Sequence, residues 1–186
     1  FDKPGNAETD DSIKIAIVGK PNAGKSSLCN KLLGFDRTIV SDIAGTTRDA
    51  IDTLFEVNGK KYTLIDTAGI RKKKSVEEDL EYYSVLRALG AIRRADVCVM
   101  MIDAEQGVTE QDVKILGYIH EQCKPSVVVM NKWDLIEKDS NTINKFNADL
   151  AEALKFMDYF IPIYVSAKTG QRVDKILSVC ETAIAN

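Results

Sequence analysis

The stretch GKPNAGKS at residues 19–26 decides the fold of this chain. An apolar run precedes it at residues 13–18, and a helical pattern follows at residues 25–33. The spacing G-x-x-x-x-G-K-S predicts a phosphate-binding loop when it joins a strand to a helix, and that setting is present here. We therefore expect a polyphosphate held by backbone N–H groups at the start of the helix. The simpler alternative is a glycine-rich turn that happens to contain Lys-Ser.

Four residues of the loop have expected roles. Gly19 and Gly24 let the backbone curl around the phosphates. Lys25 is expected to reach the β- and γ-phosphates, and Ser26 to offer its hydroxyl to Mg²⁺. By itself the loop therefore predicts a polyphosphate with magnesium, which includes ATPases, kinases and GTPases.

The composition is that of a single globular domain. The chain has 186 residues, of which 45% are hydrophobic and 28% charged, and its net charge is −3. This balance gives no global argument for binding nucleic acid or a membrane. No apolar run reaches transmembrane length, and there is no signal-peptide pattern. Four scattered cysteines without a CxxC pair fit a reducing cytosol and no zinc site, so we expect a cytoplasmic protein.

Strand and helix patterns alternate after a polar start. We expect residues 1–11 to be a linker or tail and residues 12–186 to form one domain. Strands are expected at 13–18, 51–57, 61–66, 97–103, 126–131 and 161–165, and helices at 25–33, 77–94, 109–122, 142–157 and 171–185. Asn58-Gly59 predicts a hairpin between the second and third strands. The fold class is α/β, with three layers, a six-stranded, mostly parallel sheet containing one antiparallel strand, and about five helices.

In such a sheet, ligands bind at the carboxyl ends of the strands, and this is where further motifs stand. Asp66-Thr67-Ala68-Gly69 follows the third strand. Beside a phosphate loop, the Asp66 carboxylate is expected to hold the Mg²⁺ shell, and the Gly69 N–H to bond a γ-phosphate. The alternative for Asp66 is a helix N-cap.

Asn131-Lys132-Trp133-Asp134 follows the fifth strand and predicts recognition of a purine base. The Asp134 carboxylate can accept two hydrogen bonds from guanine N1–H and N2–H₂, which adenine does not offer. Asn131 can bond the base edge and tie the motif to the phosphate loop, and the Lys132 stem can lie over the purine face. The turn Ser166-Ala167-Lys168 would close the other side of the base. Taken alone, Asn-Lys-x-Asp is equally compatible with a solvated turn, and the string at 166–168 carries little information by itself.

Two segments are candidates for mobile loops. Residues 41–49 have no helical period, and a threonine there can complete the Mg²⁺ shell when a γ-phosphate is present. The alternative is a polar connector. Residues 67–80 contain the basic run Arg71-Lys72-Lys73-Lys74, which is either a solvated face or a contact for RNA or another anionic partner.

In this order, the motifs resemble those of the translation-factor-related P-loop GTPases, whose fold is Ras-like. GTTRD at 45–49, DTAGIRKK at 66–73 and NKWD at 131–134 are similar to the second GTPase domain of the Der (EngA) family, in the Era/MnmE-like branch. Members are bacterial tandem GTPases of large-subunit ribosome assembly. The resemblance implies GTP or GDP with Mg²⁺ as ligands, and the ribosomal large subunit or rRNA as partner. It also implies a preceding GTPase domain and a following KH-like domain, which agrees with a chain that starts at Phe1 rather than Met.

The resemblance also implies which residues form the site. Nucleotide contacts are implied for Gly19, Asn22, Ala23, Gly24, Lys25, Ser26, Ser27, Asp66, Gly69, Asn131, Lys132, Asp134, Ser166, Ala167 and Lys168. The implied Mg²⁺ ligands are Ser26, Thr47 and Asp66. The implied catalytic residues are Lys25, Thr47, Gly69 and Asn22.

One departure from the family pattern concerns hydrolysis. Ras-like members place a water-orienting glutamine just after DTAG, where this chain has Ile70. The resemblance therefore implies slow intrinsic hydrolysis. It also implies a K⁺ ion in place of an arginine finger, held by Asn22 with Ser41, Ile43 and Thr46.

Two other functions remain open at this point. The chain is compatible with a nucleotide-binding interaction module that is nearly inactive in isolation, because the glutamine is missing. It is also compatible with the GTPase domain of an MnmE-like tRNA-modifying protein, which shares the Asn-Ala-Gly-Lys-Ser loop. The string at residues 70–73 and Trp133 argue against the second alternative.

Overall fold

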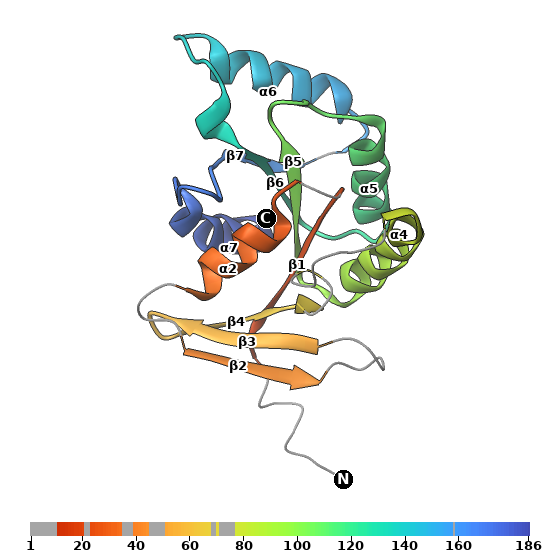
Figure 1. Cartoon of the computed structure of the whole chain (residues 1–186), viewed down its shortest axis with the longest axis vertical. Coiled ribbons are helices and arrows are strands. Elements are labelled where there is room, and N and C mark those ends of the chain that lie inside the picture. Colours follow the sequence, from red (N-terminus) through yellow and green to blue (C-terminus); the bar gives the residue numbers. More distant parts are fainter. Residues whose placement is uncertain are drawn as a thin grey trace.

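The computed structural model describes residues 11–20, 23–34, 39–44, 51–67, 70, 77–157 and 159–186. For residues 39–44, 51 and 77–85 it describes the backbone only. These parts form one α/β domain in which a central sheet lies between two layers of helices (Figure 1). The predicted fold class is confirmed.

The sheet has seven strands in the described residues, in the order β2-β3-β4-β1-β5-β6-β7. Their bounds are β1 Ile13–Gly19, β2 Ile39–Ala44, β3 Ile51–Val57, β4 Lys60–Leu64, β5 Val97–Asp103, β6 Ser126–Asn131 and β7 Ile161–Tyr164. β3 runs antiparallel to both of its neighbours, and the other neighbouring pairs run parallel. Because β1 is the central strand, the phosphate loop that follows it lies in the middle of the carboxyl edge.

Helices cover both faces of this sheet. Those in the described residues are α2 Lys25–Leu33, α4 Glu77–Arg94, α5 Glu110–Glu121, α6 Thr142–Ala153 and α7 Ile176–Ala185. Helices α2 and α7 contribute to the core on one face, and α4, α5 and α6 to the core on the other. Two 3₁₀ helices, Trp133–Leu135 and Val173–Lys175, stand after β6 and before α7.

Alternation along β5 shows how one sequence segment serves both cores. All seven of its residues are buried. Val99 and Met101 pack with α2 and α7, whereas Met100 and Ile102 pack with α4, α5 and α6. Successive side chains of a strand point to opposite faces, so a strand covered on both sides is a continuous apolar run.

The hairpin predicted from Asn58-Gly59 is confirmed. β3 and β4 pair antiparallel up to Val57 opposite Lys60. Asn58 has φ 53° and Gly59 has φ 83°. Two consecutive left-handed residues are what the two-residue type I′ turn requires.

The structure contains one strand more than the six predicted. Residues 39–44, which overlap the predicted mobile loop 41–49, pair antiparallel with β3, from Ile39 opposite Glu56 to Ala44 opposite Ile51. This pairing satisfies backbone groups of β3 that would otherwise form an open edge. The loop prediction is therefore wrong for residues 41–44, and its remaining residues 45–49 lie outside the described part.

Several predicted segments are longer than the elements that form. The strand predicted to residue 66 ends at Leu64, because Asp66 has a left-handed φ of 56° that no strand accommodates. The helix predicted over 142–157 ends at Ala153. The last predicted helix becomes a 3₁₀ turn followed by α7.

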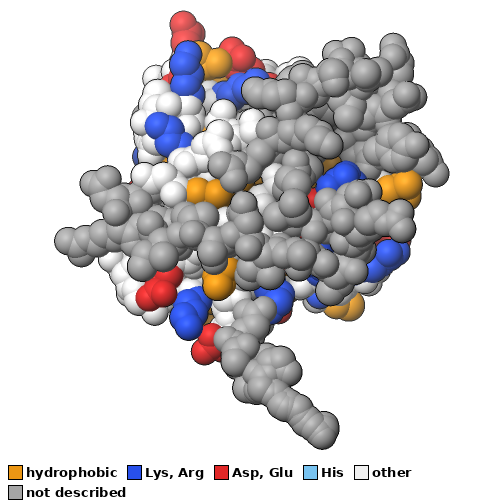
Figure 2. Space-filling view, turned by 60° about the horizontal axis from the view of Figure 1, so that its bottom comes forward, with side chains coloured by type: hydrophobic (Ala, Val, Ile, Leu, Met, Phe, Trp, Pro, Cys, Tyr) orange, Lys and Arg blue, Asp and Glu red, His pale blue; other side chains and the backbone are white. Residues whose placement is uncertain are grey.

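The predicted domain begins at a buried residue. Ser12 is buried, and its hydroxyl is 2.7 Å from that of Thr63. Residues 1–10 of the predicted linker lie outside the described residues. Figure 2 shows acidic and basic side chains mixed over one face of the described surface, without a field of one sign. Of the helices described, none is both long enough and apolar enough to cross a membrane.

Candidate functional site

Two glycines shape the loop between β1 and α2. Gly24 has φ +106°, and a Cβ added there would lie 2.1 Å from Nδ2 of Asn131. A Cβ on Gly19 would lie 2.7 Å from the carbonyl oxygen of Met101. Neighbouring segments thus approach the loop so closely that only glycine fits at these positions.

The Lys25 ammonium lies over the loop that carries it. Its Nζ donates hydrogen bonds to the carbonyl oxygens of Gly19 at 2.5 Å and Lys20 at 3.3 Å. Burial lowers the pKa of Lys25 to about 8, so the group remains mostly charged at neutral pH. Among the described residues, no carboxylate pairs with this ammonium. Its positive charge is therefore available to a phosphate, beside Ser26 and the exposed Ser27 in the first turn of α2.

The Asn131 amide joins two loops that are far apart in the sequence. Its Nδ2 donates to the carbonyl oxygen of Ala23 at 2.8 Å, and its Oδ1 accepts from the backbone N–H of Ala167 at 2.9 Å. The side chain is buried at the end of β6. The predicted tie between this motif and the phosphate loop is confirmed, and a second tie to the turn at 166–168 was not predicted.

Aromatic packing holds the base motif, residues 131–134, from the side of the protein core. Trp133 is buried, with its ring centroid 4.6 Å from that of Tyr164 and 5.2 Å from that of Phe146. Its backbone N–H donates to the carbonyl oxygen of Val165 at 3.0 Å. Asp134 follows directly and is exposed. A rigid ring beneath the motif therefore presents the Asp134 carboxylate outward.

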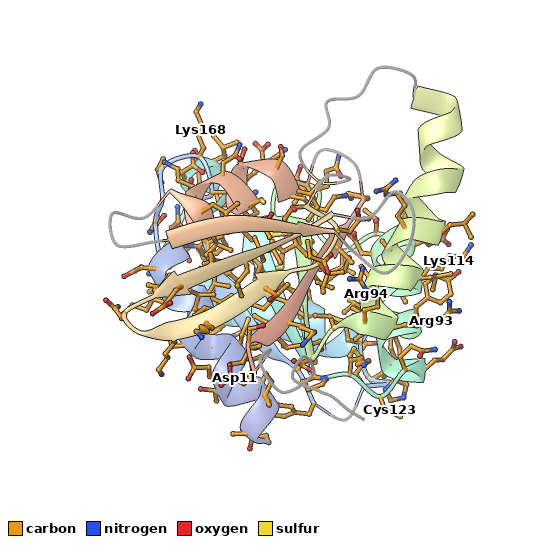
Figure 3. All side chains as sticks on the ribbon, turned by 90° about the horizontal axis from the view of Figure 1, so that it is seen from below. Asp11, Arg93, Arg94, Lys114, Cys123 and Lys168 are labelled. Carbon is orange, nitrogen blue, oxygen red and sulfur yellow. The ribbon has the colours of Figure 1, made fainter. Side chains whose placement is uncertain are left out.

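The third part of the site is the turn after β7. Ser166 is buried, and its hydroxyl accepts the N–H of Thr169 at 3.1 Å. Ala167 is buried as well, whereas Lys168 is exposed and extends away from the body of the domain (Figure 3). The turn is thus anchored through Ser166 and Ala167 and leaves Lys168 at the surface.

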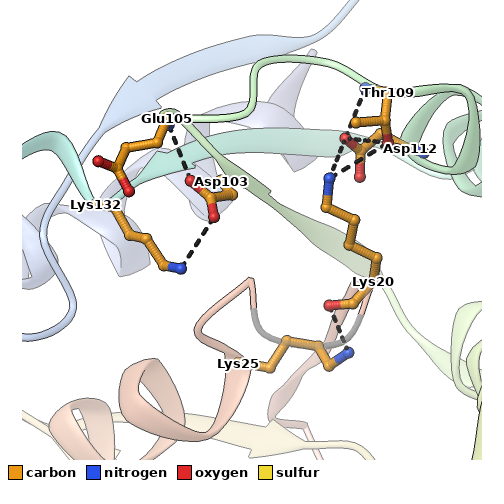
Figure 4. Close-up of polar contacts among 7 residues, drawn as sticks. All are labelled: Lys20, Lys25, Asp103, Glu105, Thr109, Asp112 and Lys132. Carbon is orange, nitrogen blue, oxygen red and sulfur yellow. Dashed lines mark hydrogen bonds and ion pairs between the residues drawn. The ribbon is translucent and has the colours of Figure 1, made fainter. Parts of the chain in front are cut away.

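Lys132 is held by an acidic residue that sequence reasoning missed. Its Nζ lies 2.9 Å from Oδ2 of Asp103, the last residue of β5, and Oδ1 of Asp103 accepts the N–H of Glu105 at 2.9 Å (Figure 4). Burial by itself would raise the pKa of the Asp103 carboxyl, but the hydrogen bonds from Lys132 and Glu105 outweigh it and hold that pKa below its ordinary value. The pair fixes the direction of the Lys132 stem.

A second ion pair anchors the phosphate loop itself. Lys20 is buried, and its Nζ lies 3.6 Å from Oδ2 of Asp112 and 3.4 Å from Oγ1 of Thr109 (Figure 4). Thr109 and Asp112 form the capping box that starts α5. The segment from Asp103 to Asp112 therefore contacts both the phosphate loop and the base motif.

Asp66, the predicted magnesium ligand, is paired with an arginine of α4. Arg87 donates from Nη2 to Oδ1 at 2.7 Å and from Nε to Oδ2 at 3.0 Å. The backbone N–H of Asp66 donates to Oδ1 of Asp52 at 2.8 Å. The carboxylate thus lies just beyond β4, which ends at Leu64, and has a guanidinium as its partner.

The structure offers one observation on whether these residues fit a metal-bound polyphosphate. Lys25, Asp66, Ile70 and Arg87 line the same cavity of about 90 Å³, together with Gly19 and apolar residues of β1 and α4. An ammonium for phosphate oxygens and a carboxylate for a cation thus face one space. Ser26 and Asp66 fit the predicted magnesium site by the chemistry of their oxygens.

Several predicted site residues lie outside the described part of the chain. These are Asn22, Thr46, Thr47 and Gly69, as well as the basic run at 71–74. Ser41 and Ile43 belong to β2, for which the backbone alone is described. The K⁺ site and the Thr47 ligand therefore stay predictions.

The site residues that were not predicted differ in how clearly the sequence marks them. Asp103 ends a buried strand at the same edge as the recognised motifs, so the rule that located those motifs would have found it. Thr109 with Asp112 three residues later follows the pattern of a capping box. Arg87 has no local signal, because its partner Asp66 lies in another element.

Comparison with known proteins agrees with this geometry. A family model described as 50S ribosome-binding GTPase matches residues 14–132. The chain belongs to this GTPase family. The close contact between Gly24 and Asn131 and the ion pairs of Lys20 and Lys132 are therefore features of a GTPase domain.

Curated relatives named GTPase Der match nearly the whole chain. One from Clostridium perfringens is 54% identical over 187 residues, covering 100% of this chain and 43% of the relative. One from Ruminiclostridium cellulolyticum is 59% identical over 169 residues, covering 91% of this chain and 38% of the relative. The resemblance to the Der family is confirmed, and the chain spans about two-fifths of the length of these relatives.

Two solved structures share the fold at lower identity. Era in complex with MgGDPNP and a fragment of 16S ribosomal RNA is 30% identical, with a TM-score of 0.68 over 92% of this chain and 56% of that chain. Era from Aquifex aeolicus bound to GDP·AlF4⁻ is 31% identical, with a TM-score of 0.67 over 91% of this chain and 56% of that chain. The Ras-like P-loop fold predicted from the sequence is confirmed.

Replacing Gly24 tests the close approach of the loop to Asn131. Gly24→Ala adds a methyl group 2.1 Å from Nδ2 at a left-handed φ, so we expect unfolding to become easier by about 2–4 kcal/mol and GDP binding to weaken at least ~100-fold. Urea unfolding and calorimetry measure both. The matched control is Gly59→Ala, which has φ +83° and nothing within 4 Å, and which should lose about 1 kcal/mol and no affinity. Equal behaviour of the two variants would contradict the packing argument.

Asp103→Asn tests the anchor of Lys132. We expect guanine nucleotides to bind about 3–10-fold more weakly, because the Lys132 side chain, no longer held, must be ordered when the nucleotide binds. The affinity for tripolyphosphate, which has no base, should be unchanged. Since the pKa of Asp103 lies below its ordinary value of 3.8, the contribution of the pair to stability is complete above that value and is lost as pH falls through the lower, folded one. Urea unfolding should therefore show a difference in unfolding free energy between the wild type and the variant at neutral pH, and this difference should shrink only in acid. A weaker tripolyphosphate affinity would contradict the assignment to Lys132.

Proposed function

We propose that this chain is the GTP-binding and GTP-hydrolysing switch domain of a GTPase of large-subunit ribosome assembly, as the second GTPase domain of a Der-type tandem protein. The observation that carries the proposal is the Asn131 amide, which joins the phosphate loop to the turn at residues 166–168. A site built this way holds the phosphates and the base of one ligand at fixed separation. The family match and the relatives named GTPase Der support it.

Recognition of guanine falls to Asp134. Its exposed carboxylate accepts hydrogen bonds from guanine N1–H and N2–H₂, and adenine would leave the carboxylate unpaired. The Lys132 stem, held by Asp103, lies over one face of the purine. The turn at Ala167 and Lys168 closes the other side.

Binding of the phosphates falls to the loop and to the magnesium ligands. Lys25 pairs with β- and γ-phosphate oxygens, and the Gly69 N–H bonds the γ-phosphate. Ser26, Thr47 and Asp66 would hold Mg²⁺. When bound, this ion neutralises charge that develops between the β- and γ-phosphates.

Hydrolysis is proposed to be slow. Ile70 lines the cavity that contains Lys25 and Asp66, and its side chain has no donor or acceptor to orient a water molecule. Asn22, Ser41, Ile43 and Thr46 would hold a K⁺ ion whose charge replaces that of an arginine finger.

A second candidate is a nucleotide-binding interaction module that is almost inactive in isolation. The apolar Ile70 beside the phosphate cavity favours it. An MnmE-like GTPase domain is a weaker alternative, since the relatives named GTPase Der match over nearly the whole chain.

The proposed partners follow from the same family. They are the ribosomal large subunit or its RNA, and the preceding GTPase and following KH-like domains of a longer chain. The basic run at residues 71–74 is a proposed contact for an anionic partner, and the cytoplasm is the proposed location.

Asp134→Asn tests the recognition of guanine by the Asp134 carboxylate. An amide can donate to the 2-oxo group of xanthine but pairs poorly with guanine, so GDP affinity should fall at least ~100-fold while XDP affinity rises. Calorimetry with GDP, XDP and ADP measures the preference, and Glu137→Gln, which removes a nearby exposed carboxylate, is the control. An unchanged GDP affinity would refute the base assignment.

Potassium dependence separates the enzyme from the binding module. Single-turnover GTP hydrolysis should be at least ~10-fold faster in KCl than in NaCl at equal ionic strength, since a fixed cation stabilises the transition state. Asn22→Ala should remove that difference. A wild-type rate equal to that of GTP in buffer would favour the interaction module, and equal rates in both salts would refute the K⁺ site.

A further inference from the structure

Two arginines of α4 each pair with an aspartate of the sheet. Arg87 binds Asp66 at 2.7 and 3.0 Å, and Arg94 binds Asp52. Seven residues separate the arginines, which is about two helical turns, so they lie on the same face of α4. Arg93, the neighbour of Arg94, is exposed by contrast (Figure 3).

The two aspartates are themselves joined, because the Asp66 N–H donates to Oδ1 of Asp52 at 2.8 Å. Arg87, Asp66, Asp52 and Arg94 therefore form one continuous chain of polar contacts that docks α4 against the ends of β3 and β4. One of its members, Asp66, is also the carboxylate that the proposed function assigns to magnesium.

We propose that Arg87 is a positioning residue that competes with the divalent cation for Asp66, so that the docking of α4 depends on whether Mg²⁺ is bound. This inference rests on the proposed function. The guanidinium occupies both carboxylate oxygens, one through Nη2 and the other through Nε. Each oxygen keeps a second lone pair, but a divalent cation placed there would lie within a few ångströms of Arg87, and like charges at that distance repel.

Two neighbouring turns in the C-terminal half of α4 differ in their burial. Ala91 and Ile92, near its C-terminal end, are buried in the core. Leu86 is 48% exposed, and Arg87, Ala88 and Ala91 line the cavity of about 90 Å³ that lies between α4 and β1. Loss of the Arg87–Asp66 pair therefore removes one described contact of α4 beside this cavity, while Arg94 and Asp52 still hold its C-terminal turn.

The first test measures cation affinity without using hydrolysis. Mn²⁺ is titrated into the GDP complex and free Mn²⁺ is read by electron paramagnetic resonance. Arg87→Gln removes the competing charge and should tighten Mn²⁺ binding by about 3–10-fold, with GDP affinity in EDTA unchanged. Arg87→Lys keeps the charge without the two-pronged geometry and should fall between. Arg93→Gln is the matched control and should equal the wild type.

The second test follows α4 itself. Hydrogen exchange of amides 86–90 in the GDP complex should speed up when Mg²⁺ is added to the wild type, and should already be fast without Mg²⁺ in Arg87→Gln. Unchanged or weaker Mn²⁺ binding in Arg87→Gln, or wild-type exchange that does not respond to Mg²⁺, would overturn the inference. Failure of the wild type to bind GDP would instead refute the proposed function.

Discussion

The side-chain amide of Asn131 is the interaction on which the rest of the site depends. It is buried at the end of β6, donates to Ala23 of the phosphate loop at 2.8 Å and accepts from Ala167 at 2.9 Å. A Cβ on Gly24 would lie 2.1 Å from its Nδ2, so the loop must have glycine there to approach the amide this closely. A buried amide with both ends hydrogen-bonded is stabilising, whereas its loss leaves two backbone groups without partners. One side chain thereby sets the distance between phosphate and base recognition.

Of the three lysines Lys20, Lys25 and Lys132, Lys25 alone has no carboxylate partner among the described residues. Lys20 is paired with Asp112, and Lys132 with Asp103, through two ends of the same segment between β5 and α5. Lys25 contacts backbone carbonyls. The Lys25 ammonium is therefore the cation that faces a phosphate in the loop. Lys20 and Lys132, held in ion pairs, anchor the loop and the base motif. Asp66 is the acidic counterpart, and its pairing with Arg87 connects the same cavity to α4.

The features that could be predicted from the sequence are those whose cause is local. The phosphate loop follows from eight consecutive residues between an apolar run and a helical pattern, and the Asn58-Gly59 turn from two left-handed residues. Strand β2 could not be predicted in this way, because residues 39–44 become a strand by pairing with β3. Asp103 and Asp112 were missed because their importance lies in contacts with Lys132 and Lys20, which come from other elements. The pairing of Arg87 with Asp66 likewise requires α4 to be docked on the sheet.

Substitution of the central amide tests the account most directly. Calorimetry should compare GDP and tripolyphosphate binding to Asn131→Ala, with Asn144→Ala, an exposed asparagine of α6, as the control. If the amide positions the phosphate loop, both ligands should lose at least ~10-fold in affinity, although tripolyphosphate has no base to contact. A loss of affinity for GDP but not for tripolyphosphate would show that Asn131 contacts the base without positioning the phosphate loop. Unchanged affinity for both ligands would contradict the central role of the amide.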